Sequence, residues 1–167
     1  AIGLSEESSI ATPEFQIQMT QDPNQHPLTT LPRSAGEVVN ALSFDIEDWF
    51  HLVDIKAVSD TEQWGSFPSI VERRTEEILD ICAQHGATAT FYFLGWIAER
   101  YPGLVRRVVE AGHEIGTHSY WHRKVCDLDE ATFREDLLRS IKVIENAGGA
   151  EVTSFRAPSF SITPGTE

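Results

Sequence analysis

The sequence predicts an α/β fold, namely the first half of a (β/α) barrel that follows a flexible N-terminal leader. Short apolar runs rich in β-branched and aromatic residues alternate with longer segments of helical period. Strands that alternate with helices imply right-handed crossovers and a parallel sheet. Residues able to do chemistry follow three of the predicted strands, and in barrels of this kind the chemistry lies at the carboxyl ends of the strands.

The ordered domain is expected over residues 37–167. Four strands are predicted, over residues 38–44, 88–94, 112–116 and 152–155. A helix separates each strand from the next. Ser69 begins a capping-box spacing for the first helix, which Gly86 closes. The second helix opens at Tyr101-Pro102, and Asp129 caps the third.

Residues 1–36 are predicted to form the flexible leader because they carry proline, glutamine, serine and threonine with neither hydrophobic period. The start of the chain lacks the basic and apolar runs of a signal peptide, and no stretch is long enough to span a bilayer, so a cytoplasmic location is the expectation. Thirteen basic and 26 acidic residues give a net charge of −13. That charge disfavours nucleic acid and anionic membranes, and it suits a neutral sugar polymer or a cation.

Two histidines four positions apart, His118 and His122, follow the third predicted strand. If residues 117–122 continue into a helical turn, both imidazoles face the same side and can hold one cation. Two imidazoles and a carboxylate suit zinc, with cobalt or nickel as alternatives. The sequence therefore predicts a site for one divalent metal.

Three carboxylates, Asp45, Glu47 and Asp48, crowd the end of the first predicted strand. Their mutual repulsion is unfavourable unless a cation or a proton offsets it. If the strand continues, Glu47 shares a face with Asp45 while Asp48 points away; if the chain turns after Ile46, Asp48 is brought in. Glu47 is favoured as the metal carboxylate, and Asp48 stays open.

These segments, together with the arginine and proline of Arg156-Ala157-Pro158, resemble the polysaccharide deacetylase family, the NodB-homology or carbohydrate esterase 4-like proteins. In that family an aspartate-rich motif, an H-(S/T)-x-x-H motif and an R-x-P motif follow one another at about these separations. The amino-acid sequence is similar to that of the deacetylases found with exosortase-linked exopolysaccharide clusters at residues 45–50, 91–102, 111–115 and 156–161. The likeness covers about residues 38–162.

The resemblance implies a distorted, TIM-like barrel and a metal-dependent hydrolase that removes N-acetyl groups from an amino-sugar polysaccharide by cleaving a carbon–nitrogen amide bond. It implies that Asp45 is the base that takes a proton from water. It also implies that Arg156 pairs with Asp45 and keeps it ionised and oriented. The metal ligands would be His118, His122 and one carboxylate.

Candidate substrate contacts are Pro158, Trp49 and Phe160. Trp49 belongs to an aromatic loop, with Phe50, Trp64 and Phe67. Its rings are expected either to roof a sugar-binding groove or to pack into the barrel rim.

The predicted domain breaks off after the third motif, whereas the family supplies a general-acid histidine and a further aspartate motif from later strands. Weak or absent turnover is therefore expected from these residues alone. A half barrel leaves its last parallel strand as an unpaired edge, which favours pairing with another copy of the chain. A homo-oligomer that completes the barrel would restore activity.

Two other functions stay open. One is a non-catalytic carbohydrate-binding or assembly module that keeps the metal site as a relic, and it would bind without cleaving. The other is a metal-free allantoinase-like enzyme that opens cyclic ureides, but that branch of the family loses the ligand histidines and this chain retains them.

Overall fold

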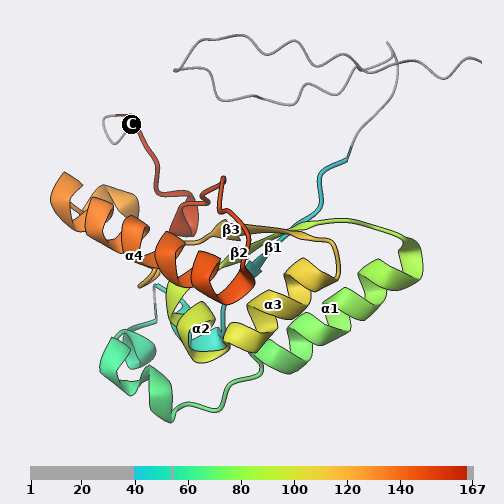
Figure 1. The fold of residues 1–167 in the computed structure, drawn as a ribbon. Helices are drawn as coiled ribbons and strands as arrows, with labels where there is room; N and C mark the ends of the chain where they lie inside the picture. Colours follow the sequence, from blue (N-terminus) through green and yellow to red (C-terminus); the bar gives the residue numbers. More distant parts are fainter. Residues whose placement is uncertain (1–39, 54, 165–167) are drawn as a thin grey trace, which may run out of the picture. The chain divides into compact units, whose positions relative to one another are not determined.

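The computed structural model describes residues 40–53 and 55–164, so the predicted leader lies outside the described residues. Its sheet holds three parallel strands in the order β1 (Ser43–Ile46), β2 (Thr90–Phe93) and β3 (Glu114–Thr117), as Figure 1 shows. The predicted parallel α/β architecture is confirmed. Each strand holds four residues and is shorter than predicted.

The predicted fourth strand is not formed among the described residues. Instead, a single parallel bridge joins Thr117 to Phe155. The N–H of Thr117 donates to the carbonyl of Ser154, and the N–H of Arg156 donates to the carbonyl of Thr117, each across 2.9 Å. This one bridge continues the order of the sheet and fixes the start of the loop that carries Arg156.

Four α-helices accompany the strands in the described part of the chain: α1 (Val71–His85), α2 (Gly95–Arg100), α3 (Pro102–Glu110) and α4 (Glu130–Gly148). Helix α4 packs against α2, α3 and β3, as can be followed in Figure 1. The core between them includes Leu104, Val108, Ile115 and Ile144, all nearly or fully buried. No helix in this described part is long and apolar enough to cross a membrane.

The helix ends mostly follow the predicted chemistry. Gly86 closes α1 with a φ of 59°, a left-handed conformation that favours glycine, and Asp129 caps α4 by accepting from the N–H of Thr132. The capping box at Ser69 is wrong. The cap position belongs to Ile70, because the Ser69 hydroxyl donates to Asp48 across 2.5 Å.

Helix α2 is not among the helices that the pattern predicts. Its first four residues, 95–98, are all buried, so they show no alternation of apolar and polar positions.

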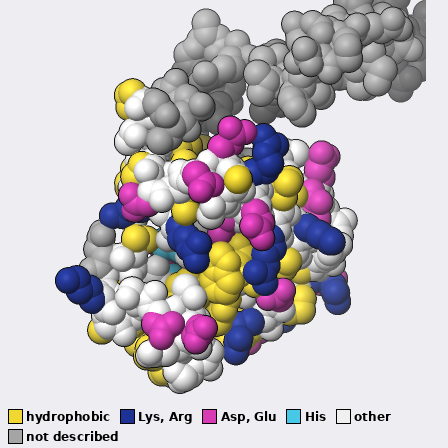
Figure 2. Space-filling model, turned by 90° about the vertical axis from the view of Figure 1, so that its left-hand side faces the viewer, with side chains coloured by type: hydrophobic (Ala, Val, Ile, Leu, Met, Phe, Trp, Pro, Cys, Tyr) yellow, Lys and Arg dark blue, Asp and Glu magenta, His cyan; other side chains and the backbone are white. Residues whose placement is uncertain are grey.

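The thiol of Cys82 on α1 is buried, as predicted. Acidic and basic side chains are interspersed over the face drawn in Figure 2 rather than gathered by sign.

The aromatic loop between β1 and α1 folds into three short 3-10 turns: η1 (Trp49–His51), η2 (Lys56–Val58) and η3 (Thr61–Ser66). Phe50 and Trp64 are almost fully buried, with ring centroids 5.9 and 5.5 Å from that of Trp96. These two rings therefore pack into the core instead of roofing a groove. Trp49 stays 44% exposed.

Candidate metal centre

The loop after β3 brings His118 and His122 together, but not through helical spacing. Residues 118–122 contain no helix, so the predicted helical turn is wrong. Ser119 and His122 have φ values of 68° and 54°, in the left-handed region that non-glycine residues seldom adopt. These conformations turn the loop back on itself and bring the ring centroids of the two imidazoles to 4.8 Å from each other, at an angle of 53° between the ring planes.

Asp136 on α4 holds this loop in place. Its buried carboxylate accepts hydrogen bonds from the backbone N–H groups of Tyr120 and Trp121, at 2.6 and 3.1 Å. Burial raises the pKa of Asp136, while the two N–H groups act in the opposite direction. The pattern of the sequence does not reveal this role, because Asp136 contacts backbone groups far from it along the chain.

Both imidazoles have the same tautomer. The Nδ1 atom of His118 lies 2.7 Å from the carbonyl oxygen of Arg156, and the Nδ1 atom of His122 lies 2.7 Å from that of His51. A carbonyl oxygen only accepts, so each Nδ1 carries the hydrogen and each Nε2 presents a lone pair. The two Nε2 atoms lie 3.1 Å apart.

Glu47 completes the cluster. Its Oε2 atom is buried without a hydrogen-bond partner and lies 3.2 Å from the Nε2 atom of His122. One ligand atom each from Glu47, His118 and His122 lie within 4.8 Å of one another. Two lone pairs and a carboxylate oxygen in such proximity repel unless a cation lies between them. The donor set therefore fits a divalent transition metal that prefers imidazole and carboxylate ligands.

The protonation states of the two histidines agree with metal binding at this cluster. Burial lowers the pKa of His122 to about 4, and nearby His118 adds to the shift. Burial also lowers the pKa of His118. Both rings are thus neutral near pH 7, the form that binds a metal. Burial, with a contribution from Asp45, raises the pKa of Glu47 to about 7.

Asp48 lies outside the cluster. Its buried carboxylate accepts from the Ser69 hydroxyl at 2.5 Å and from the N–H of Ile70 at 3.1 Å, at the start of α1. Its own N–H donates to Nδ1 of His51 across 2.8 Å. Of the two carboxylates that the sequence leaves open, the structure brings Glu47 to the histidines and uses Asp48 to anchor the turn that carries His51.

Asp45 and Arg156 form an ion pair beside the cluster. Nη1 of Arg156 lies 2.6 Å from Oδ1 of Asp45, and Nη2 donates to the Ser43 hydroxyl across 2.5 Å. The guanidinium also lies over the ring of Tyr92, 4.2 Å from its centroid. The other oxygen of Asp45, Oδ2, lies 4.0 Å from Nε2 of His118. Arg156 thus occupies one oxygen of Asp45 and leaves the other directed toward the histidines.

A cavity of about 370 Å³, the metal pocket, is lined by the cluster, Asp45 and Arg156. Of the predicted substrate contacts, Phe160 is in its lining and is 97% exposed, while Pro158 is buried and Trp49 is not part of the lining. Ser159 and Phe160 both have positive φ values, 54° and 53°. The turn that follows Pro158 holds the Phe160 ring in solvent.

Residues 56–166 match the sequence profile of the family described as polysaccharide deacetylase. The chain belongs to the polysaccharide deacetylase family. Peptidoglycan-N-acetylglucosamine deacetylase of Bacillus cereus is 33% identical over 88 residues, which are 53% of this chain and 32% of that protein. Chitooligosaccharide deacetylase of Sinorhizobium fredii is 34% identical over 85 residues, which are 50% of this chain and 40% of that protein.

Solved structures carry the polysaccharide deacetylase fold as well. The family 4 carbohydrate esterase from Streptomyces lividans, in complex with acetate, is 27% identical, with a TM-score of 0.57 over 74% of this chain and 53% of that one. The chain therefore has a partial (β/α) barrel, as predicted. It spans less than half the length of the two curated relatives named above.

Proposed function

We propose that this chain carries the metal and base residues of a polysaccharide N-deacetylase, a hydrolase that removes N-acetyl groups from an amino-sugar polymer. The observation that carries the proposal is the convergence of two imidazole lone pairs on the unpartnered Oε2 atom of Glu47. The named activities of the Bacillus cereus and Sinorhizobium fredii relatives support the reaction and the substrate class.

A zinc, cobalt or nickel ion held by Glu47, His118 and His122 would polarise the acetamide carbonyl and lower the pKa of water to about 7. Asp45 would take the proton from the attacking water at Oδ2, since Arg156 already occupies Oδ1. The carbonyls of Arg156 and His51 keep both ligand rings in the metal-binding tautomer.

The leaving nitrogen needs a proton once its bond to the acetyl carbon breaks. Among the described residues that line the metal pocket, Asp45 is the one acidic group outside the proposed ligands. The proton that Asp45 takes from water is therefore the one that this part of the chain can return to nitrogen. That single carboxylate would serve as base and then as acid.

Phe160 would hold the sugar. Its exposed ring in the lining of the metal pocket offers an apolar face for a sugar ring, and this position supports the proposal. Pro158 would act indirectly, by shaping the turn that directs Phe160 outward. Trp49, whose indole N–H donates to the carbonyl of Pro68, lies outside this pocket and would contribute less.

We further propose that the polymer is an exopolysaccharide of the kind made by exosortase-linked gene clusters. The sequences of residues 45–50 and 156–161 support this narrower assignment because they resemble those of the deacetylases found with such clusters. These two segments also supply Asp45, Glu47 and Arg156. Comparing acetate release from an acetylated exopolysaccharide with that from peptidoglycan would test it. Faster release from peptidoglycan would contradict it.

Metal content is the first measurement. The protein is purified without chelators and analysed by plasma mass spectrometry beside a His118→Ala/His122→Ala double variant and a His85→Ala control, in which the histidine is exposed at the end of α1. We expect about one equivalent of transition metal in the wild type and in the control, and none in the double variant. Metal absent from the wild type, even after zinc is added, would overturn the proposal.

Acetate release from N-acetylglucosamine oligomers then separates the two remaining functions. Release that depends on the metal supports the hydrolase. Binding of metal and of oligomer without acetate release would instead identify the chain as a non-catalytic carbohydrate-binding module.

A further inference from the structure

One peptide group in the loop after β3, the group that joins Ser119 to Tyr120, is bonded at both ends to side chains of α4. The hydroxyl of Ser140 donates to its carbonyl oxygen across 2.9 Å, and the carboxylate of Asp136 accepts from its N–H across 2.6 Å. Asp136 and Ser140 are four residues apart, so they lie on the same face of the helix. A peptide group is planar, and two bonds on opposite edges of it fix the orientation of its plane.

The direction of the bonds at Ser140 follows from its single hydroxyl hydrogen. Ser140 is fully buried, and its Oγ atom lies 2.9 Å from the Ser119 carbonyl oxygen and 2.7 Å from Oγ1 of Thr117. Because a carbonyl oxygen only accepts, the Ser140 hydrogen is directed to Ser119, and the Thr117 hydroxyl donates to Ser140. The Ser140 hydrogen is therefore bonded to the loop, and the Thr117 hydrogen is bonded to α4.

The Ser119 carbonyl oxygen accepts a second hydrogen bond, from the N–H of Gly95 at the start of α2, across 2.8 Å. Glycine permits this approach, since a Cβ atom at position 95 would lie 2.6 Å from Cδ2 of Tyr120 and 2.8 Å from Oγ of Ser140. Both lone pairs of the oxygen are therefore bonded to helices. Of these two bonds, the one from Ser140 is made by a side chain, so a substitution can remove it.

These bonds act on a residue with a strained backbone. Ser119 has a φ of 68°, in the left-handed region, and non-glycine residues keep such conformations where the surrounding structure fixes them. Loss of a buried hydrogen bond at its carbonyl would favour relaxation of Ser119 toward an ordinary conformation. Strain of this kind gathers at functional sites, and Ser119 directly follows the candidate ligand His118.

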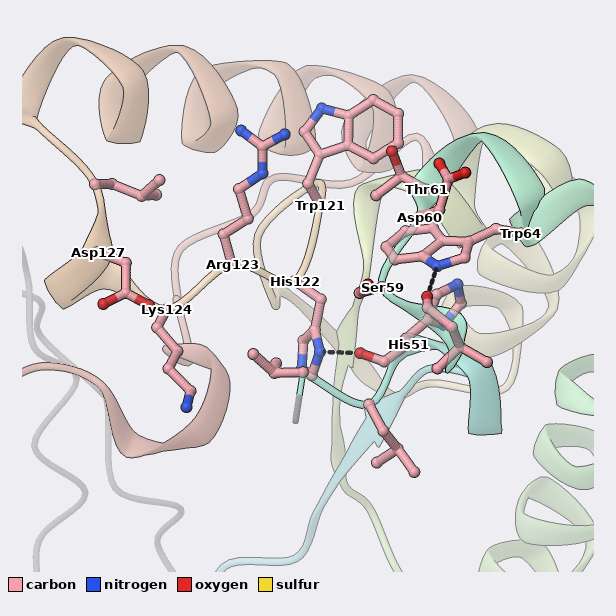
Figure 3. A pocket seen from close by; sticks show the side chains of 14 residues that line it. His51, Ser59, Asp60, Thr61, Trp64, Trp121, His122, Arg123, Lys124 and Asp127 are labelled. Carbon is pink, nitrogen blue, oxygen red and sulfur yellow. Dashed lines mark hydrogen bonds between the residues drawn. The ribbon is translucent and has the colours of Figure 1, made fainter. Parts of the chain in front are cut away.

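The conformation of Ser119 affects where the two ligand rings point. The Nε2 atoms of His118 and His122 lie 3.1 Å apart, and the chain between them turns at Ser119. Figure 3 views this loop across a neighbouring cavity. The side chains of Trp121 and His122 leave the backbone in opposite directions there, and the ring of His122 reaches the carbonyl of His51. A backbone rotation at Ser119 would therefore move His122 relative to His118 and change the separation of the ligand atoms.

We propose that Ser140 is a positioning residue, which sets the geometry and the affinity of the candidate metal centre through the peptide group between Ser119 and Tyr120. The inference rests on the proposed function, because it concerns the same metal centre. Ser140 is not one of the clustered ligand residues, and its hydrogen bonds go to the loop and to β3. A group placed behind a metal ligand usually contributes about 10–100-fold to metal affinity.

The test is a calorimetric titration with zinc of the metal-free full chain, for the wild type, Ser140→Ala and Thr117→Val. Ser140→Ala removes the bonds to Ser119 and to Thr117 together, whereas Thr117→Val removes the bond between Thr117 and Ser140 alone. Zinc affinity should fall about tenfold in Ser140→Ala and keep the wild-type value in Thr117→Val. Thr117→Val is the matched control, because a loss caused by a missing buried hydroxyl in general would appear in both variants.

Cobalt(II) in place of zinc reports the geometry of the centre. Its visible absorption spectrum depends on the arrangement of the ligands, so Ser140→Ala at saturating cobalt should shift the absorption maxima. Thr117→Val should give the wild-type spectrum. If Ser140 only stabilised the fold, the spectrum of the folded Ser140→Ala variant would not change.

Wild-type zinc affinity and an unchanged cobalt spectrum in Ser140→Ala would overturn the inference and leave the proposed function intact. Equal losses in Ser140→Ala and Thr117→Val would also overturn it. If the wild type binds no zinc, the proposed metal centre falls, and the inference falls with it. Should Ser140→Ala fail to fold, Ser140→Cys decides, because a thiol is a weaker donor than a hydroxyl. Weakened zinc binding in that variant supports the inference, and wild-type binding overturns it.

Discussion

The carboxylate of Asp136 accepts a hydrogen bond of 2.6 Å from the backbone N–H of Tyr120, and both residues are buried. This bond ties helix α4 to the loop that carries both candidate metal histidines. Asp136 is not one of the clustered ligand residues and bonds to the backbone of the loop, so it would act by positioning the loop. Stability and metal affinity should therefore both depend on it.

Asp136→Ala leaves the buried N–H of Tyr120 and the partly buried N–H of Trp121 without an acceptor, so the free energy of unfolding should fall by about 2–4 kcal/mol. Zinc affinity should fall by about 10–100-fold, as is usual when a group behind a metal ligand is removed. Urea unfolding and a zinc titration would measure the two effects. Glu135→Ala, at the exposed neighbouring position, is the control. An Asp136→Ala variant with full zinc affinity would show that the loop keeps its shape without the carboxylate.

Alanine substitutions of the adjacent residues Glu47 and Asp48 should have different effects on metal content and stability. Glu47→Ala removes a ligand atom, so metal content should drop to background. Asp48→Ala removes the acceptor for Ser69 and Ile70, so it should cost about 1–3 kcal/mol of stability while the folded protein still binds metal. Plasma mass spectrometry measures the metal content, and thermal unfolding measures the stability. If Asp48→Ala loses the metal and Glu47→Ala keeps it, Asp48 is the ligand.

Asp45→Asn should leave metal content unchanged, because Asp45 is not one of the three clustered ligand atoms. Its rate of acetate release should fall about 10²–10⁴-fold, the usual contribution of a general base. Arg156→Lys keeps the charge but lacks the two-nitrogen fork that bonds Asp45 and Ser43, and it should lower the rate less. Ser43→Ala controls for the loss of the Ser43 bond alone. If the Asp45→Asn variant releases acetate at the wild-type rate, Asp45 is not the base.

Phe160→Ala should not change the thermal unfolding midpoint, since the ring is 97% exposed and buries almost nothing. If the ring stacks on the sugar in the ground state and in the transition state alike, KM should rise severalfold while kcat is unchanged. Steady-state kinetics on an oligomeric substrate would measure this. Ile162→Ala, a nearby exposed apolar residue outside the metal-pocket lining, is the control. Equal effects in the two variants would remove Phe160 as a substrate contact.

The elements predicted from period and caps are largely those observed. Gly86 and Asp129 end and begin their helices as predicted, because each acts on backbone groups within a few residues of itself. The failures arise where a distant residue competes. Ser69 is lost as a cap because its hydroxyl donates to Asp48, and α2 shows no period because its first four residues are all buried.

The sequence by itself determined the α/β class and the residue types of the candidate centre: two histidines, neighbouring carboxylates and an arginine after successive strands. These depend on local pattern and on the rule that parallel strands present their carboxyl ends at one edge. Only the tertiary structure placed Glu47 rather than Asp48 beside the two histidines, replaced the predicted helical turn with a loop held by Asp136, and showed that the His51 carbonyl bonds to the ring of His122. Those outcomes depend on contacts between segments far apart in the chain, and the period of a single segment contains no information about them.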